Sequence, residues 1–524
     1  MLSLWLACAA AACVAATAPD SAPSPAQLAF TAPPPPPPPQ QLDHAHQSHL
    51  YSFEWNDRPT FERAARLFDA DDIDLAFAGR RSRNRQQPPH WQAIVRLDEH
   101  PGHANTLDAV VDRLVELGID SPVAGHHLPL AAHLSTLDGS TSYARALSAA
   151  AIANLSSSSP LDTVGGGIHD TYHPYDGLHA ILVSLERAYP DWVRVISVGK
   201  SSEGRDIWGV KVTNHTSSAT APVDDEEDDN DDEEGPSPLV FSTTSSGSKR
   251  HKHKRSHKLG FVVSGTQHAR EWIAASTVLY LAHDLVAPDA RGKTPHHKLL
   301  NNVEFTFIPV VNPDGYVFSW DHDRLWRKSR QPVGSSSPSS SSATAKTCYG
   351  IDLNRNWGKE FQRGARPNPC SDSYPGREAF ESVELQALKS YLLDESNHVD
   401  AFFDVHSFGQ MLLFPYSYSC DVRTADEENH YEAVLQAAKA LKGVHGRQFE
   451  TGSVCEISLT SPGMSLDWTY ASAKIRWSFG AELRDGGVFG FLLPPSQIRP
   501  SGEEMSAALR SLTQFILDKE DGKR

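Results

Sequence analysis

A histidine and a glutamate three residues apart give the strongest chemical signal in the sequence. His268 and Glu271 lie in the segment GTQHAREW, where an apolar run of strand type ends and a helical pattern begins. Because residues three apart on a helical turn face the same side, both side chains can reach one metal ion. The pair alone is a weak signal, since about three such pairs are expected by chance from 25 histidines and 65 acidic residues in 524 positions.

A second histidine, His406, could complete a set of metal ligands. It follows the apolar strand pattern DAFFDV, at the carboxyl end, where open α/β sheets bind their ligands. Taken alone, a histidine among apolar residues is by default a hydrogen-bonded core histidine, and that alternative stays open. Two histidines and one glutamate together make the open ligand set of a catalytic zinc ion. The sequence therefore predicts one Zn²⁺, bound by His268, Glu271 and His406.

Three further residues could supply the rest of the chemistry of peptide hydrolysis. A zinc-bound water needs a base to take its proton, and Glu482 in FGAELRDGG is the candidate. Arg355 in IDLNRNW could bind a free α-carboxylate bidentately. Arg327 in RLWRK could stabilise the oxyanion of the attacked carbonyl. The alternatives are structural ion pairs, between Glu482 and Arg484 or between either arginine and a surface carboxylate.

The elements that would position these residues alternate between apolar strands and helices. Strands are predicted in LGFVVSGT before His268, in VEFTFIPVV up to the turn NPDG, in VDAFFDV before His406, and in WSFGAE up to Glu482. Helices are predicted in EWIAASTVLYLAHDLV and AFESVELQALKSYLLDES. Apolar strands that alternate with helices indicate the α/β class, with a central mixed, largely parallel sheet flanked by helices.

Composition divides the chain into five parts. In chain order we expect a signal peptide, a proline-rich linker, a small α/β domain, a flexible connector of small residues and a large α/β domain, with bounds 1–18, 19–48, 49–137, 138–171 and 172–524. Two low-complexity stretches of the large domain, at about 217–258 and 331–346, are predicted to be disordered insertions.

The cysteines and the first residues indicate the compartment. MLSLWLACAAAACVAATAP has the apolar run and small residues of a secretory signal, and no later stretch reaches the ~20 apolar residues of a membrane span. Removal of the signal peptide would take away Cys8 and Cys13 and leave four cysteines. Secretion permits disulfides, and Cys348–Cys370 with Cys420–Cys455 is the simplest of the three possible pairings. Asn154 and Asn214 begin glycosylation motifs. We expect a secreted, extracellular protein with no membrane partner, and the vacuole is the alternative destination.

Two opposite charge blocks contribute −4 to the net charge of −17. Residues 224–234 hold ten acids, and residues 249–258 hold six lysines and arginines. Opposite blocks in one low-complexity stretch are typical of a solvated insertion. No aromatic platform interleaves with the basic block, so a nucleic-acid partner is not expected.

Seven motifs occur in a fixed order: GTQHAREW, NPDGY, RLWRKSR, GIDLNRNW, DVHSFGQ, LDWTYA and ELRDGGVFGFLLP. From about Tyr172 onward the chain resembles the zinc carboxypeptidase A/B family in these motifs. The resemblance implies hydrolysis of the C-terminal peptide bond, so peptide and protein C-termini would be the partners. It also implies roles for individual residues: zinc ligands His268, Glu271 and His406, general base Glu482, oxyanion arginine Arg327, carboxylate-binding Asn354 and Arg355, Arg270 along the substrate path, and Asp352 orienting His268.

The resemblance extends to specificity and to the N-terminal region. Leu466 in LDWTYA occupies the position of the substrate-pocket floor, which implies a preference for apolar C-terminal residues. The small domain at 49–137 lies where family members carry an inhibitory propeptide, so the chain's own propeptide is a further expected partner. Cys348–Cys370 matches the commonest disulfide of the family.

Other positions depart from the family pattern. Leu459 stands where active members carry a tyrosine that helps to hold the substrate carboxylate, and Phe408 stands where tyrosine is frequent. Cys420, Cys455 and the long N-terminal region resemble the fungal secreted metallocarboxypeptidase-like proteins linked to cell-wall biogenesis, which are regarded as inactive. We expect a secreted zinc metallocarboxypeptidase that prefers apolar C-terminal residues. The alternative is an inactive or weak zinc-binding pseudo-carboxypeptidase involved in cell-wall biogenesis.

Overall fold

The computed structural model describes two regions that carry regular structure. The described residues are 48–55, 57–70, 74–81, 90–98, 107–117, 119, 125–129, 167–216, 257–287, 296–335, 347–361 and 368–522. The predicted signal peptide, nearly all of the predicted linker, most of the predicted connector with Asn154, and most of both predicted insertions lie outside these residues.

Residues 48–129 contain a four-stranded antiparallel sheet in the order β2-β3-β1-β4. Its strands are β1 (Ser48–Trp55), β2 (Asp74–Arg81), β3 (His90–Asp98) and β4 (Gly125–Pro129), and its helices are α1 (Arg58–Ala70) and α2 (Leu107–Glu116). Phe61, Ala64 and Phe68 of α1 recur at helical spacing and pack against alternate β1 residues such as Phe53.

The large region is built around an eight-stranded mixed sheet in the order β13-β12-β14-β11-β7-β8-β6-β5. Its strands are β5 (Val193–Lys200), β6 (Asp206–Val212), β7 (Leu259–Gly265), β8 (Val303–Ile308), β11 (Val399–His406), β12 (Met411–Phe414), β13 (Glu450–Ser453) and β14 (Trp477–Glu482). The central strands β8, β7, β11 and β14 run parallel, whereas β5, β6 and β12 pair antiparallel with their neighbours β6, β8 and β14. The predicted α/β class and mixed sheet are confirmed.

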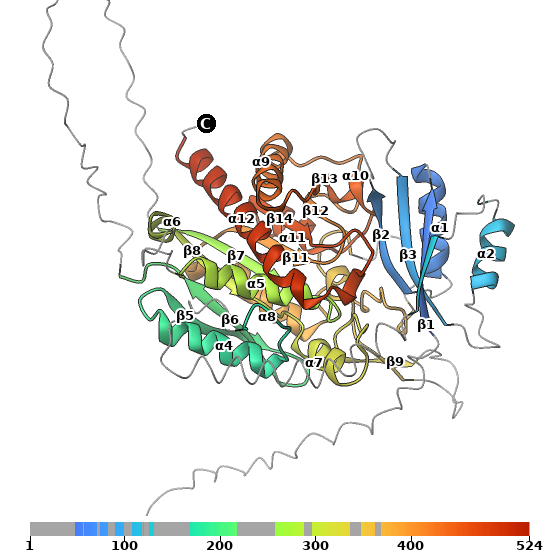
Figure 1. The fold of residues 1–524 in the computed structure, drawn as a ribbon, viewed down its shortest axis with the longest axis horizontal. Helices are drawn as coiled ribbons and strands as arrows, with labels where there is room; N and C mark the ends of the chain where they lie inside the picture. The colour runs from blue at the N-terminus through green and yellow to red at the C-terminus, as the bar shows by residue number, and fades with distance from the viewer. Residues whose placement is uncertain are drawn as a thin grey trace, which may run out of the picture. The chain divides into compact units, whose positions relative to one another are not determined.

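Helices cover both faces of this sheet (Figure 1). They are α4 (Tyr175–Ala188), α5 (Trp272–Asp284), α6 (His297–Asn302), α7 (Pro313–Asp321), α8 (Val383–Leu393), α9 (Glu427–His445), α10 (Val454–Ile457), α11 (Ser465–Ala471) and α12 (Ile498–Glu520), with short 3₁₀ turns at Leu353–Arg355, Glu395–Asn397, Gly490–Leu492 and Pro495–Gln497.

Two apolar clusters fill the space between sheet and helices. Successive strand residues alternate between them, because side chains of a strand point to opposite faces. Phe403 of β11 packs with α4, α5, α9 and α12, whereas its neighbour Phe402 packs with α8 and α11. All residues of β7 are buried, which explains why the sequence shows a continuous apolar run there.

Two segments differ from the sequence-based expectation. Residues expected at the start of the second insertion form β9 (Pro332–Ser335), which pairs with β10 (Thr347–Tyr349). The expected turn NPDG begins α7, because Asn312 caps the helix through Gly315 N and Pro313 stands at its first position.

Among the described helices, none combines the length and the apolar character that a membrane crossing requires.

Candidate metal centre

Three neighbouring parallel strands bring the candidate residues to one edge of the sheet. Strand β11 lies between β7 and β14. His406 and Glu482 are the last residues of β11 and β14 and pair in the register of the two strands. His268 lies in the turn after β7, and Glu271 directly precedes α5. The carboxyl ends of adjacent parallel strands therefore supply all four side chains, as open α/β sheets commonly do.

The turn between β7 and α5 is held by the start of α7. Thr266 adopts a φ of 55°, which a β-branched residue rarely tolerates. The backbone N–H of Asn312 donates to Thr266 O at 3.2 Å, and its side-chain amide donates to Gln267 O at 3.1 Å. These bonds stabilise the conformation that aims His268 at the other candidate ligands.

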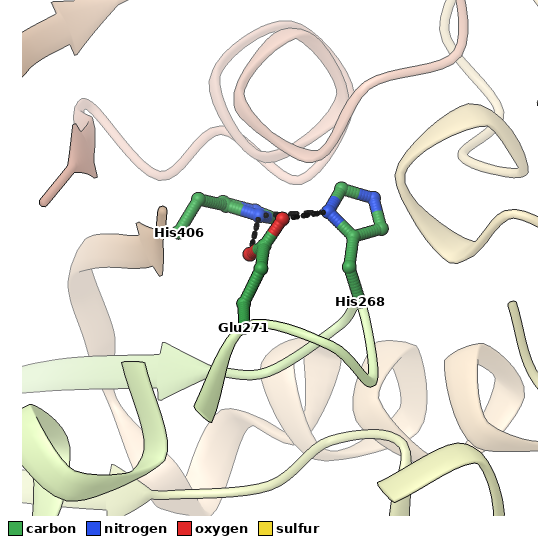
Figure 2. Close-up of side chains that lie close together, drawn as sticks. All are labelled: His268, Glu271 and His406. Atoms are coloured by element: carbon green, nitrogen blue, oxygen red, sulfur yellow. Dashed lines mark hydrogen bonds and ion pairs between the residues drawn. The ribbon is translucent and has the colours of Figure 1, made fainter. Parts of the chain in front are cut away.

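The side chains of His268, Glu271 and His406 converge on one point (Figure 2). Glu271 Oε1 lies 2.7 Å from His268 Nδ1, and Glu271 Oε2 lies 3.0 Å from His406 Nδ1. The two Nδ1 atoms are 3.2 Å apart. All three residues are buried, and their ligand atoms lie within 4.8 Å of one another. This cluster could hold a metal ion.

Each histidine turns its second ring nitrogen toward a buried carboxylate. His268 Nε2 lies 3.2 Å from Asp352 Oδ1, and His406 Nε2 lies 3.0 Å from Asp404 Oδ2. A carboxylate on Nε2 favours the proton there and leaves the Nδ1 lone pair for a metal. The donor set, two imidazole nitrogens and one carboxylate, fits a three-ligand zinc site.

The electrostatics of the cluster favour a cation. Burial opposes charge on Glu271, but His268 and His406 outweigh it and hold the pKa of Glu271 well below its usual range. Burial likewise lowers the pKa of His406, yet Asp404 and Glu271 raise it well above its usual value. A buried site that attracts protons so strongly is also suited to a divalent cation, which competes with protons for the same ligand atoms.

Arg327 is held by a buried carboxylate. Its Nε and Nη2 donate to Asp352 Oδ2 at 3.0 and 2.9 Å, and Arg327 holds the pKa of Asp352 below its usual range, against the opposing effect of burial. The same carboxylate thus contacts both a candidate ligand and the candidate oxyanion arginine. Its partner is buried, so the alternative of a surface ion pair for Arg327 is wrong.

Asn354 and Arg355 lie in one short 3₁₀ turn beside the cluster. Asn354 Nδ2 lies 3.3 Å from His406 Nε2, and Asn354 Oδ1 accepts a bond from Ser465 N at 2.9 Å. Arg355 is partly buried, and its Nη1 donates to Asn354 O at 2.7 Å. Leu466, the second residue of α11, is 2% exposed and belongs to an apolar cluster beneath the sheet. Asn354 therefore lies beside the start of α11, where Leu466 follows Ser465, and Arg355 is bound to Asn354.

Arg270 lies in the same turn as His268 and Glu271, between the two, and contacts other parts of the chain. Its Nη1 contacts Leu325 O and Asp372 Oδ2 at 3.3 Å each, and its guanidinium lies 4.4 Å from the ring centre of Phe491. The side chain is buried in these contacts. Its predicted role along a substrate path stays a prediction.

Glu482 is not paired with Arg484. Arg484 is directed to α12, where its Nε donates to Glu504 Oε2 at 2.8 Å, so the structural alternative for Glu482 is wrong. Burial raises the pKa of Glu482 to about 8, with Glu271 adding to the effect and His406 opposing it. A carboxyl group poised near neutral pH is suited to general acid–base work.

The departures from the family pattern lie close to these residues. Leu459 is partly buried in the segment between α10 and α11. That segment packs against the backbone of Arg355 in the candidate carboxylate site. Gly463 lies so close that a Cβ added to it would be 2.3 Å from Arg355 O. Phe408 is buried against Phe491, at 5.0 Å between ring centres.

The cysteines pair as the sequence-local arrangement predicts, Cys348 with Cys370 and Cys420 with Cys455. Of the two predicted glycosylation sites only Asn214 is described. Its Oδ1 accepts from Thr216 Oγ1 at 2.7 Å, and its Nδ2 donates to Asn301. Glycosylation at either position stays a prediction.

One residue that touches a candidate ligand escaped the sequence reasoning. Asp404 precedes His406 by two positions, and residues two apart on a strand share a face. The spacing of Asp404 and His406 in DVH therefore indicates that the two side chains can meet, although the carboxylate lies within a run of apolar residues.

Comparison with known proteins places this geometry among zinc carboxypeptidases. The zinc carboxypeptidase family model matches residues 178–508. An inactive metallocarboxypeptidase ecm14 of Talaromyces marneffei is 33% identical over 374 residues, which are 68% of this chain and 56% of the relative. A metallocarboxypeptidase A-like protein of Trichophyton verrucosum is 34% identical over 357 residues, 67% of this chain and 72% of the relative. This chain thus spans little more than half the length of the Talaromyces marneffei relative.

Solved structures share the fold. Bovine thrombin-activatable fibrinolysis inhibitor, in complex with tick carboxypeptidase inhibitor, matches with a TM-score of 0.52 and 29% identity over 67% of this chain and 99% of that chain. Carboxypeptidase A from Helicoverpa armigera matches with a TM-score of 0.63 and 22% identity over 90% of this chain and 98% of that chain.

Proposed function

The chain belongs to the zinc carboxypeptidase family, and from this premise we propose that it binds one Zn²⁺ and the C-termini of peptides, with weak or absent hydrolytic turnover. The observation that carries the proposal is the buried convergence of His268, Glu271 and His406. A zinc ion held there would polarise a peptide carbonyl and lower the pKa of a bound water. Peptide binding would depend on other side chains, which lie beside the candidate metal ligands.

Substrate binding would use the neighbouring turn and helix. Arg355 offers a guanidinium fork for a terminal carboxylate, and Asn354 offers an amide beside it. The buried leucine at position 466 suits an apolar C-terminal side chain. These groups lie beside the metal cluster, so a peptide carboxylate bound by them would bring its last peptide bond near the metal.

Weak turnover is supported by position 459 and by the relatives. Leucine has no hydroxyl, so Leu459 cannot supply the hydrogen bond that a tyrosine there would give to a terminal carboxylate. Several of the similar curated proteins are named inactive metallocarboxypeptidases. A role in cell-wall biogenesis belongs to this proposal as a prediction.

An active zinc carboxypeptidase that prefers apolar C-terminal residues is the second candidate, and one observation favours it. Glu482 is the last residue of β14 and pairs with His406 in the sheet register, so its carboxylate lies at the same edge of the sheet as the candidate ligands. From there it could take a proton from an attacking water and later give it to the leaving amine. Arg327 would stabilise the oxyanion of the attacked carbonyl while it keeps its bond to Asp352.

A single set of assays separates the two candidates. Purified full chain is analysed for zinc content, for binding of a peptide that ends in Leu, and for hydrolysis of the same peptide before and after limited trypsin treatment. The peptide with an amidated C-terminus is the matched ligand control, and Glu482→Gln is the control for catalysis. Stoichiometric zinc with carboxylate-dependent binding and no turnover supports the first candidate, whereas turnover lost in Glu482→Gln supports the second. A chain that binds neither zinc nor the peptide contradicts both.

We also propose secretion, outside the cell or to the vacuole, with residues 49–137 acting as the chain's own inhibitory propeptide. Support comes from the apolar N-terminal run, the two disulfides and the strands and helices of the N-terminal region. Detection of the mature N-terminus in culture medium by mass spectrometry tests both parts.

A further inference from the structure

We propose that Asp404 is a positioning residue that links the metal ligand His406 to helix α11 and thereby couples metal binding to peptide binding. The inference rests on the proposed zinc and peptide binding. It deepens that proposal by giving a role to a residue that is neither a metal ligand nor a peptide-binding residue. It stands on the contacts of one buried carboxylate.

Asp404 has the geometry of a fixed hydrogen-bond acceptor. It is 1% exposed and lies on the same face of β11 as His406. Oδ1 accepts from Ser264 Oγ at 3.0 Å, across the strand pair β7–β11. Oδ2 accepts from His406 Nε2, from Gln267 Nε2 and from Ser465 Oγ. Three donors on Oδ2 and one on Oδ1 engage both oxygens, so the orientation of the carboxylate is fixed.

The two carboxylates behind the histidines differ in charge balance. Asp352 is bound by the guanidinium of Arg327, which offsets its negative charge. In the described part of the chain, the bonded partners of Asp404 are two hydroxyls, one amide and the histidine itself. Asp404 therefore directs more of its charge to its histidine than Asp352 does, and strengthens His406 as a ligand.

The same carboxylate contacts the start of α11. Ser465 is the first residue of α11, and it donates its hydroxyl to Asp404 and its backbone N–H to Asn354. Asn354 in turn lies 3.3 Å from His406 Nε2. His406, Asp404, Ser465 and Asn354 thus form a closed ring of contacts, and the next residue along the chain is Leu466.

A second chain of contacts runs from Asp404 to α11 through aromatic residues. Gln267 donates to Asp404 and accepts from Trp357 Nε1 at 3.1 Å. Trp357 is fully buried and packs against Trp468 of α11, with ring centres 5.3 Å apart. A metal that fixes the His406 ring would therefore order the first residue and the middle of the helix that carries Leu466, and a bound peptide would strengthen metal binding by the same factor.

The test uses metal-stripped full chain, titrated with zinc against a chromophoric chelator. Asp404→Asn is expected to weaken zinc binding by about 10- to 100-fold, which is the usual effect of losing such a partner. Asp352→Asn is the matched control at the other histidine. Cobalt-loaded protein gives a structural readout, because the visible spectrum of cobalt reports its ligand geometry and should change in Asp404→Asn.

Coupling is measured with the peptide that ends in Leu. In the unmodified chain, saturating zinc should tighten peptide binding at least about fivefold. Ser465→Ala removes one donor to Asp404 and leaves the ligand set intact, so it should reduce this factor toward one while zinc affinity changes less than in Asp404→Asn. It also serves as the second variant if Asp404→Asn does not fold.

The outcomes separate this inference from the function on which it rests. Zinc binding by the unmodified chain together with Asp404→Asn affinity within twofold of it would overturn the positioning role alone. An unchanged coupling factor in Ser465→Ala would overturn the link to α11. Failure of the unmodified chain to bind zinc would overturn the proposed function and, with it, this inference.

Discussion

Among single residues, Leu459 is the departure from the family pattern that we expect to limit turnover. Leu459→Tyr would place a phenol in the segment that packs against the backbone of Arg355. A hydrogen bond to a charged group contributes about 1.5–3 kcal/mol, so kcat/KM for a peptide ending in Leu should rise roughly ten- to hundredfold. Steady-state hydrolysis of that peptide is the measurement.

Leu459→Phe is the control for this change, because it adds the ring without the hydroxyl. Equal rates in the tyrosine and phenylalanine variants would show that the missing hydroxyl does not limit turnover.

Single-residue partners were predictable only where they are local in the chain. The His268–Glu271 spacing is a local property of one turn, and it identified two candidate ligands. The Arg327–Asp352 and Arg484–Glu504 pairs join elements that meet only in the folded sheet. Local spacing cannot indicate such pairs. The alternative pairing of Glu482 with Arg484, which their closeness in the sequence suggested, is wrong because Arg484 binds Glu504.

Among elements, the contact between α12 and the end of β14 positions Glu482. Arg484 and Glu504 are both buried, and removing one partner leaves an uncompensated charge. Glu504→Ala should therefore destabilise the domain by about 3–5 kcal/mol and lower the thermal midpoint by several degrees. Differential scanning calorimetry measures the change.

The neighbouring Glu503→Ala is the matched control, because Glu503 makes an exposed pair with His445. Its effect should stay below about 1 kcal/mol. Equal losses of stability in the two variants would show that the buried pair between Arg484 and Glu504 contributes no more than the exposed pair.

Buried histidines around α5 make stability dependent on pH. Burial lowers the pKa of His173 and of His283 to about 4, whereas an unfolded histidine titrates near 6.5. Between these values the unfolded chain binds more protons, so the free energy of unfolding falls as the pH is lowered from about 6.5 to 4. Each residue should cost about 2 kcal/mol by pH 5.

Urea unfolding at pH 7, 6 and 5 measures this dependence. His173→Asn can still donate to Ile168 O, as His173 Nε2 does at 2.7 Å, and should reduce the slope by about one proton. A stability that is flat from pH 7 to 5 would contradict the buried neutral state of these histidines.

Elements were predictable in type but not in sheet order. Apolar runs identified β7, β8, β11 and β14 because these strands are covered on both faces. The motif NPDG looked like a turn, since Asn, Pro and Gly favour turns as well as helix starts. The placement of β14 between β11 and β12 depends on long-range pairing, for which the sequence contains no local signal.

For the whole molecule, metal removal should change stability. A ligand that binds only the folded chain adds about 2.7 kcal/mol at one hundred times its dissociation constant. Zinc-loaded protein should therefore unfold several degrees above protein stripped with a chelator, and added zinc should restore the difference. His406→Ala is the control, because its midpoint should not respond to zinc.

The order of strands in the large sheet also determines when the edge that carries the metal site is completed during synthesis. Strand β12 joins the sheet only through β14 on one side and β13 on the other, and β14 is the last strand to be made. Until residues 477–482 emerge from the ribosome, β12 and β13 have no strand that connects them to β11, and the edge carrying His406 is open. Completion of this edge of the sheet therefore waits for β14, and the pair between Arg484 and Glu504 then joins that strand to α12.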